Sequence, residues 1–311
     1  MFTIGADPEF MLMDASGKMR SAIGVIPGTK KNRHKFNGHE FYYDNVLAEI
    51  AVRPASSKNQ FIESLEESFK YLSDFAGDCS VVAQAACNFD KSELQHPDAN
   101  EGGCEEEFCA YLLRSESVSD SFFIKNKLRT AGGHIHIGTD VIESEIDRQF
   151  VARMLDLFVG IPSVCLDQDP TSIRRRKLYG KAGRYRDPDY GIEYRSLGNF
   201  WLSSTKLVSI IHDLVEFIMD FVSEGRHFDF WTVDFEAIDN DDNYNQPGWS
   251  ISDAHVCFGY DSVGLQKSIN SGKLDESLLD LVNSLLPNGL SNKLSKAMEY
   301  DQFNLEDEWD L

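Results

Sequence analysis

The chain has few basic residues for its length. Its 311 residues include 30 Lys and Arg but 51 Asp and Glu, which gives a formal net charge of −21. Non-specific binding of nucleic acid needs a broad positive field, so this charge argues against such a function. A small local basic site remains compatible with the composition.

Long apolar runs and regular cysteine spacings are also missing. No window reaches the roughly 18 apolar residues of a membrane helix, and the N-terminus lacks the basic region of a signal peptide. The six cysteines, Cys79, Cys87, Cys104, Cys109, Cys165 and Cys257, form no CxxC pair. Reduced thiols are therefore expected rather than a disulfide or metal framework. We expect a soluble, cytoplasmic protein with no membrane partner.

The apolar pattern predicts both strands and helices. Strands are expected over 2–13, 40–54, 80–90, 130–139 and 193–202, with a hairpin turn at 14–17. Helices are expected over 59–76, 143–160, 205–223 and, as short pieces, 261–299, with Ser56 or Ser57 and Ser204 as caps and Pro162 as a stop. Residues 28–38, 93–106, 168–190 and 234–245 have loop composition, and disorder is expected for the tail 305–311. Strands and helices do not alternate regularly, so the pattern favours α+β with a mainly antiparallel sheet.

Three polar pairs are the most informative motifs, and each spans residues i and i+2. They are Asp7 and Glu9, His134 and His136, and Glu193 and Arg195. Such residues share one face of a strand. Burying these groups without partners would be costly, whereas divalent metals and a polyphosphate would satisfy all of them.

Each pair also has a plainer interpretation. Asp7 and Glu9 could be solvated acids on an exposed edge that Pro8 protects. His134 and His136 could be core histidines bonded to the backbone, and an HxH pair also occurs in zinc hydrolases.

Two further segments could contribute to the same site. In a regular strand Asn45, Leu47 and Glu49 share a face and Asp44 points away unless a bulge intervenes, so Glu49 is the better candidate ligand. A basic segment follows later, with Arg174, Arg175, Arg176, Lys177, Lys181, Arg184 and Arg186. Solvated surface charge is the usual explanation of such a cluster. The interleaved Gly and Tyr residues favour a loop that cradles an anion, because Arg offers forked donors to phosphate oxygens.

Taken in order, these motifs resemble the glutamine synthetase and glutamate–cysteine ligase superfamily. Gly-Ala-Asp-Pro-Glu-Phe, Gly-Gly-His-Ile-His-Ile-Gly and Tyr-Gly-Ile-Glu-Tyr-Arg-Ser-Leu look like its phage-type COOH-NH2 ligase (amidoligase) branch, over about residues 1–225. The resemblance implies a curved, mainly antiparallel sheet, a glutamine synthetase-like half-barrel lined with metal ligands and backed by helices. It also implies a catalytic domain over 1–260, which leaves 261–311 as a short helical extension with an acidic tail.

The resemblance further implies roles for individual residues. Glu9 and Glu49 would hold one Mg2+ or Mn2+ ion, and Asp7, His134 and Glu193 a second. Contacts to ATP phosphates would come from His136, Arg174, Arg176, Lys181 and Arg184. The catalytic residues would be Arg195, Glu193 and Arg186, with Arg195 stabilising the transferring phosphoryl group. Asp7 stands where the family usually has the longer Glu, so its ligation could run through water.

The function implied is an ATP-dependent ligase that joins a carboxylate to an amine through an acyl phosphate. Its substrates would be small molecules or peptides, and an oligomer is compatible with the resemblance. The alternatives are a guanidino kinase, a metal-dependent hydrolase using the HxH and carboxylate groups, and a non-catalytic binding protein. The acidic loop 234–242 could attract a cationic amine, although solvated charge explains it equally well.

Overall fold

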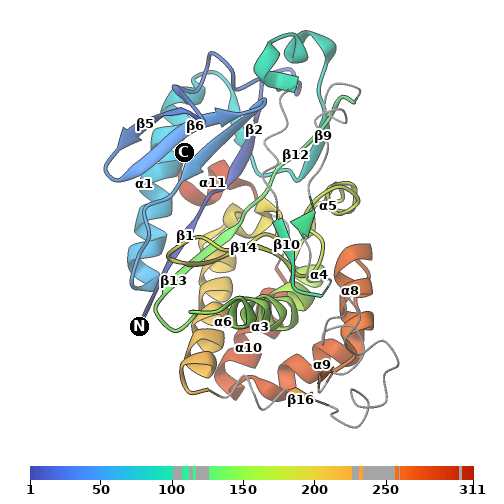
Figure 1. Cartoon of the computed structure of the whole chain (residues 1–311). Helices are drawn as coiled ribbons and strands as arrows, with labels where there is room; N and C mark the ends of the chain where they lie inside the picture. Colours follow the sequence, from blue (N-terminus) through green and yellow to red (C-terminus); the bar gives the residue numbers. More distant parts are fainter. Residues whose placement is uncertain are drawn as a thin grey trace.

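The computed structural model describes residues 1–100, 107–111, 115–116, 126–225, 231–233, 256–258, 260–300 and 303–311, of which 115–116, 231–233 and 256–258 as backbone only. Helices and mainly antiparallel sheets make up these parts of the chain (Figure 1). The prediction of an α+β fold is confirmed, and neither large sheet closes on itself within the described residues.

The first sheet contains seven strands from the N-terminal part of the chain. In spatial order they are β3 (Met19–Arg20), β2 (Glu9–Met13), β7 (Leu47–Ala51), β6 (His39–Asp44), β4 (Gly28–Thr29) and β5 (Asn32–Phe36), with β8 (Ser80–Val82) paired to β2. Every pairing is antiparallel except that of β4 with β6. The prediction of a loop over 28–38 is therefore wrong, because these residues form the β4–β5 hairpin.

The second sheet combines strands that are far apart in sequence. Its order is β1 (Phe2–Ala6), β13 (Ile135–Thr139), β15 (Gly191–Tyr194), β14 (Arg184–Arg186), β10 (Glu107–Cys109) and β11 (Ser115–Glu116). Two small ribbons complete the strands: β9 (Ala86–Asn88) with β12 (Leu128–Thr130), and β16 (Trp231–Val233) with β17 (Val256–Phe258).

The chain passes from one large sheet to the other at Asp7 and Pro8. The prediction of one strand over 2–13 is wrong, because β1 belongs to the second sheet and β2 to the first. Backbone bonds join the sheets here: Val52 N–H donates to Ala6 O at 2.9 Å, and Ile50 N–H donates to Pro8 O at 3.1 Å. The two sheets therefore meet along the Asp7–Pro8 segment.

Other predicted strands are interrupted for local reasons. Residues 40–54 form the hairpin β6–β7, whose turn places Asn45 at φ 58°, a conformation that Asn tolerates. The predicted strand 80–90 is split into β8 and β9, and the strand predicted over 193–202 ends at Tyr194 before the 3-10 helix η4 (Asn199–Ser203). β13 starts only at Ile135, after the two glycines.

Two long helices match their predictions. In α1 (Lys58–Ala76) Ser57 accepts from Gln60 N–H, and in α6 (Thr205–Ser223) Ser204 accepts from Leu207 N–H. The others are α3 (Glu145–Leu155), η3 (Asp156–Gly160), α4 (Ile161–Leu166), α5 (Ser172–Arg176), α8 (Ser262–Ser271), α9 (Glu276–Leu285), α10 (Asn288–Ala297), α11 (Leu305–Trp309), η1 (Lys91–Leu94) and η2 (Pro97–Asn100). The short helices predicted over 261–299 are confirmed as α8 to α10.

Pro162 does not end its helix, contrary to prediction. A π-helical turn, η3, separates α3 from α4 and places Pro162 in the first turn of α4, where its missing N–H is tolerated. The continuous run Glu145–Leu166 is then apolar and long enough to cross a membrane, contrary to the prediction that no such stretch exists. Because 83% of its apolar window is buried inside the molecule, it has the pattern of a core helix in a soluble protein.

Helix α1 covers one face of the first sheet and leaves the other face to polar groups. Phe10 of β2 meets Phe69 of α1 edge to face, with ring centroids 5.2 Å apart. Successive side chains of a strand point to opposite faces, so Glu9 lies on the side away from α1, directly across from Glu49 of β7. The hydrophobic core thereby orients the acidic residues toward the junction of the sheets.

The C-terminal tail is ordered, although disorder was predicted for 305–311. Helix α11 is the last helix in the sequence, yet it lies beside α1 and the first sheet, which come from the N-terminal part of the chain (Figure 1). Trp309 packs edge to face on Phe69, with ring centroids 5.0 Å apart, and its ring N–H donates to Leu202 O at 2.9 Å. Glu306 accepts from Val81 N–H at 3.0 Å.

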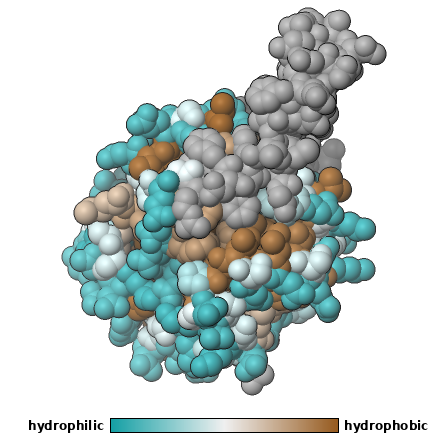
Figure 2. All heavy atoms as spheres, turned by 90° about the horizontal axis from the view of Figure 1, so that it is seen from below, coloured by the Kyte–Doolittle hydropathy of each residue, from teal (hydrophilic) through white to brown (hydrophobic). Residues whose placement is uncertain are grey.

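The surface seen in Figure 2 is mostly hydrophilic, with apolar residues gathered in the middle of that face.

Because Trp309 is almost fully buried, truncating it should destabilise the whole fold. We expect Trp309→Ala to lower the free energy of unfolding by about 3–5 kcal/mol, the usual cost of removing a buried aromatic ring. Urea denaturation measures this, with the exposed neighbour Asp307→Ala as control, whose effect should stay within about 0.5 kcal/mol. Equal effects of the two variants would contradict the packing described.

Candidate active site

A pocket of about 280 Å³ lies where the two sheets meet. Its wall carries five carboxylates, two imidazoles and five cationic side chains: Asp7, Glu9, Asp44, Glu49, Glu193, His134, His136, Lys30, Arg33, Arg129, Arg186 and Arg195. The three polar pairs singled out in the sequence therefore meet in one place. Of the predicted metal ligands, Asp7, Glu9, Glu49, His134 and Glu193 are all present.

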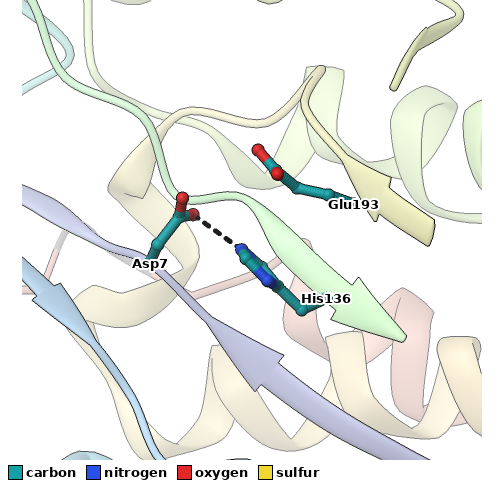
Figure 3. A group of neighbouring side chains, drawn as sticks. All are labelled: Asp7, His136 and Glu193. Atoms are coloured by element: carbon teal, nitrogen blue, oxygen red, sulfur yellow. Dashed lines mark ion pairs between the residues drawn. The ribbon is translucent and has the colours of Figure 1, made fainter. Parts of the chain in front are cut away.

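The first acidic group, Asp7, His136 and Glu193, joins three segments (Figure 3). His136 of β13 and Glu193 of β15 are direct cross-strand partners, and Asp7 comes from the break after β1. The Asp7 carboxylate points at the His136 ring, with Oδ1 3.1 Å from Nε2. His134 joins from the same side, its Nδ1 2.9 Å from the same Asp7 oxygen.

The facing atoms of this group lack hydrogen bonds. Asp7 Oδ1 and His136 Nε2 are buried without a hydrogen-bond partner, although they lie 3.1 Å apart. Short separations without hydrogen-bond geometry are the arrangement expected of ligand atoms that share one ion. One ligand atom from each of Asp7, His136 and Glu193 lies within 4.8 Å of the others, so the residues fit a divalent cation.

Tyr190 fixes the orientation of His136. Its hydroxyl lies 2.5 Å from His136 Nδ1, and the two rings are stacked with centroids 5.9 Å apart. A metal-binding His usually donates its second N–H to such a partner, which leaves the other nitrogen for the ion. Here that nitrogen is Nε2, the atom that faces Asp7.

The second acidic group consists of Glu9, Asp44 and Glu49. Glu9 and Glu49 face each other across β2 and β7, and Asp44 ends β6 beside them. Tyr42, across from Glu49, donates its hydroxyl hydrogen to Glu49 Oε1 at 2.6 Å. The preference for Glu49 over Asp44 was based on a single straight strand, and the turn at Asn45 instead brings both carboxylates together.

Close burial perturbs the titration of these groups. Burial, and then the charge of Asp44, raises the pKa of Glu9 to about 7 and the pKa of Glu49 well above its ordinary value. Burial alone would also raise the pKa of Asp7, but His134 and His136 lower it well below its usual range. Burial beside Arg195 lowers the pKa of His134 to about 3, which keeps that imidazole neutral and able to bind a metal.

Arg195 lies at the centre of a buried ionic network. It contacts Glu193 and donates from Nε to Glu107 Oε2 at 3.1 Å. Arg175 supports the same segment by donating to Arg195 O at 3.3 Å and Ser196 O at 3.1 Å. Arg186 lies 3.6 Å from Glu193, so two arginines face the first acidic group.

Most of the basic segment does not reach the pocket. Of the residues predicted to bind ATP, His136 lines its wall, whereas Arg174 bonds Asn88, Arg176 pairs with Asp167 and Arg184 lies 3.8 Å from Glu107. Lys181 is also absent from the wall, and its carbonyl accepts from Ser196. ATP binding by Arg174, Arg176, Lys181 and Arg184 stays a prediction that these positions do not favour. Arg186 and Tyr179 are the parts of the segment that the fold brings to the pocket.

The two glycines before His134 are required by close packing. A Cβ on Gly132 would lie 2.5 Å from His134 Nε2, and one on Gly133 would lie 2.8 Å from Gly198 O. Gly132 N–H also donates to Glu9 Oε2 at 2.5 Å. Tyr42, Tyr190 and Glu107 were not predicted as site residues, because they become partners of the site only through the fold.

A further acidic group, His212, Asp213 and Glu216 of α6, lies outside this pocket. Asp213 already pairs with Lys58 and with Lys293, the latter at 3.0 Å. Those cations compete with an ion for its carboxylate, so this group is less suited to a metal. The acidic loop 234–242 lies outside the described residues.

Fold and site together define a protein with a buried acid–histidine–arginine centre at the junction of two antiparallel sheets. Residues 126–233 match the family model described as Phage phiEco32-like COOH.NH2 ligase-type 2. The match covers 108 of the 311 residues and includes His134, His136, Arg186, Glu193 and Arg195. No curated protein matches the chain. The family match supports a carboxylate–amine ligase, with small carboxylate and amine substrates.

Buried acids with raised pKa values should destabilise the metal-free protein at high pH. Because the folded-state pKa of Glu49 exceeds the unfolded value, its favourable contribution is present at low pH and is lost as the pH rises. We expect Glu49→Gln to raise the free energy of unfolding in EDTA by about 1–3 kcal/mol near pH 8, and by much less near pH 4.

Urea titrations at the two pH values measure this difference. Glu40→Gln on the neighbouring strand β6 is the control, because Glu40 pairs with Arg33 and Lys35 and its pKa is lowered. That variant should not be stabilised. A destabilised Glu49→Gln protein near pH 8 would contradict the electrostatic description.

Proposed function

We propose that this protein is an ATP-dependent carboxylate–amine ligase that forms an amide or peptide bond through an acyl phosphate. The observation that carries the proposal is the convergence of two acidic groups and two arginines in one pocket. A ligase needs to activate a carboxylate, which is a poor electrophile for an amine, and a phosphoryl group provides a leaving group. The joined sheets would correspond to the half-barrel of the glutamine synthetase superfamily, and the location would be cytoplasmic.

Two divalent ions, Mg2+ or Mn2+, would neutralise charge on the phosphate oxygens of bound ATP. Asp7, His136 and Glu193 would hold one ion, with His134 alongside, and Glu9, Asp44 and Glu49 would hold the other. The donors suit this role, because carboxylate oxygens with one imidazole are ligands that Mg2+ and Mn2+ accept. This assignment exchanges His134 for His136 as the main imidazole ligand of the first ion.

The protein's own groups would do the rest. Arg195 and Arg186 would stabilise negative charge next to Glu193, where the phosphoryl group passes to the substrate. Tyr190 would hold His136 in the metal-binding tautomer.

The number of bound Mn2+ ions tests the metal assignment. We expect about two ions per chain in the wild type and about one in both Asp7→Asn and Glu49→Gln, because each variant disables one group and leaves the other. Titration followed by electron paramagnetic resonance counts the free ion. His212→Gln, from the group on α6, is the control and should still bind two. A wild type that binds none would exclude the proposed metal centre.

Hydroxylamine trapping tests the reaction. In the presence of Mg2+, ATP and pooled amino acids or small peptides, an acyl phosphate gives a hydroxamate and free phosphate. We expect Arg195→Gln to lower this rate by roughly 10²–10³-fold, the usual cost of losing an electrostatic donor. Arg20→Gln removes an arginine that pairs with Glu93 outside the pocket, and this variant should keep the rate.

Other outcomes would identify the competing functions. A phosphorylated product without free phosphate would indicate a guanidino kinase. Hydrolysis that proceeds without ATP would indicate a metal-dependent hydrolase. Thermal unfolding of each variant, measured alongside, separates loss of chemistry from loss of fold.

A further inference from the structure

A second group of cations lines the pocket on the side away from Arg186 and Arg195. The β4–β5 hairpin carries Lys30, Lys31, Arg33 and Lys35 within six residues, in a chain whose net charge is −21. Of these, Lys30 and Arg33 belong to the pocket wall. The proposed phosphate contacts at Arg186 and Arg195 do not account for them.

The hairpin is held firmly by its inner face. Phe36 stacks on Tyr71 of α1 with ring centroids 3.8 Å apart, and His34 Nε2 lies 3.1 Å from the Tyr71 hydroxyl. Because side chains alternate along β5, Arg33 points to the opposite face. There its guanidinium lies 4.3 Å from the centre of the Tyr42 ring.

Both cations lie next to the second acidic group. Lys30 Nζ is 3.2 Å from Asp44 Oδ2, and Tyr42, beneath Arg33, bonds Glu49. Arg33 also pairs with Glu40 at 3.0 Å, and Glu40 pairs with Lys35 at 3.1 Å. Lys30 thus contacts the second acidic group directly at Asp44, and Arg33 is separated from Glu49 by the Tyr42 side chain. About one-third of each of the two cationic side chains is exposed.

We propose that Lys30 and Arg33 form a subsite for a second anionic group on the carboxylate substrate. This rests on the proposed function: the reacting carboxylate would lie between the two acidic groups, and the second anion would extend toward the hairpin. Amide formation itself uses one carboxylate, so cations at this end of the pocket select the substrate rather than activate it. The substrate class is an acid with a carboxylate or phosphate at its far end.

Binding of three small acids tests this subsite without ATP. The probes are glutarate, 3-phosphonopropionate and pentanoate, titrated by calorimetry into protein saturated with Mg2+. We expect at least one dianion to bind about tenfold more tightly than pentanoate, as for one added charge-assisted contact. Preference for glutarate indicates a second carboxylate, and preference for the phosphonate indicates a phosphate.

Variants of the hairpin identify the source of the preference. Arg33→Gln and Lys30→Gln should each remove most of the tenfold preference and leave pentanoate binding unchanged. Lys31→Gln, an exposed cation of the same hairpin that does not line the pocket, should have no effect. Glu40→Gln, which removes the carboxylate that pairs with Arg33, should tighten dianion binding.

Two results would overturn the subsite. One is a wild type that binds neither dianion more tightly than pentanoate. The other is an equal loss of the dianion preference in Lys31→Gln and Arg33→Gln, which would indicate a general electrostatic attraction to the hairpin rather than a subsite. Because ATP is absent, these outcomes are separate from the hydroxylamine assay. Failure of phosphate release would therefore count against the ligase function and leave the anion preference to be judged by itself.

Discussion

The passage of the chain between two sheets at Asp7 and Pro8 is the constraint on which the site depends. Asp7 directly follows β1 and Glu9 begins β2. Although only two residues apart, Asp7 therefore belongs to the first acidic group and Glu9 to the second. Pro8 has no N–H to donate and suits a point where the chain leaves a ladder, while its carbonyl still accepts from Ile50. One short segment thereby supplies a carboxylate to each half of the pocket.

Burying the acidic groups of the site costs electrostatic free energy, which apolar packing elsewhere in the fold offsets. Glu9 and Glu49 are buried beside Asp44, and their pKa values are raised. Apolar packing of Phe10 on α1 and ordering of Trp309 against the same helix hold the strands in place. Such strained arrangements of charge are typical of functional sites, where a ligand supplies the missing partners.

Much of this arrangement was predictable from local patterns. Helical spacing with Ser57 and Ser204 as caps predicted α1 and α6, and all six residues of the three polar pairs line the pocket. Asp44 was ranked below Glu49 because the Asp44–Asn45 turn was treated as continuous strand. Pro162 was misjudged because a π-helical turn is not visible in apolar spacing, and Tyr190 becomes a partner of His136 only through long-range folding.

Anomalous diffraction from crystals grown with Mn2+ would show whether metal ions bind at the junction of the two sheets. We expect two strong peaks in the pocket, one among Asp7, His136 and Glu193 and one among Glu9, Asp44 and Glu49. A pocket without a peak, or a peak confined to His212, Asp213 and Glu216 on α6, would contradict the claim that the junction of the two sheets is a metal centre.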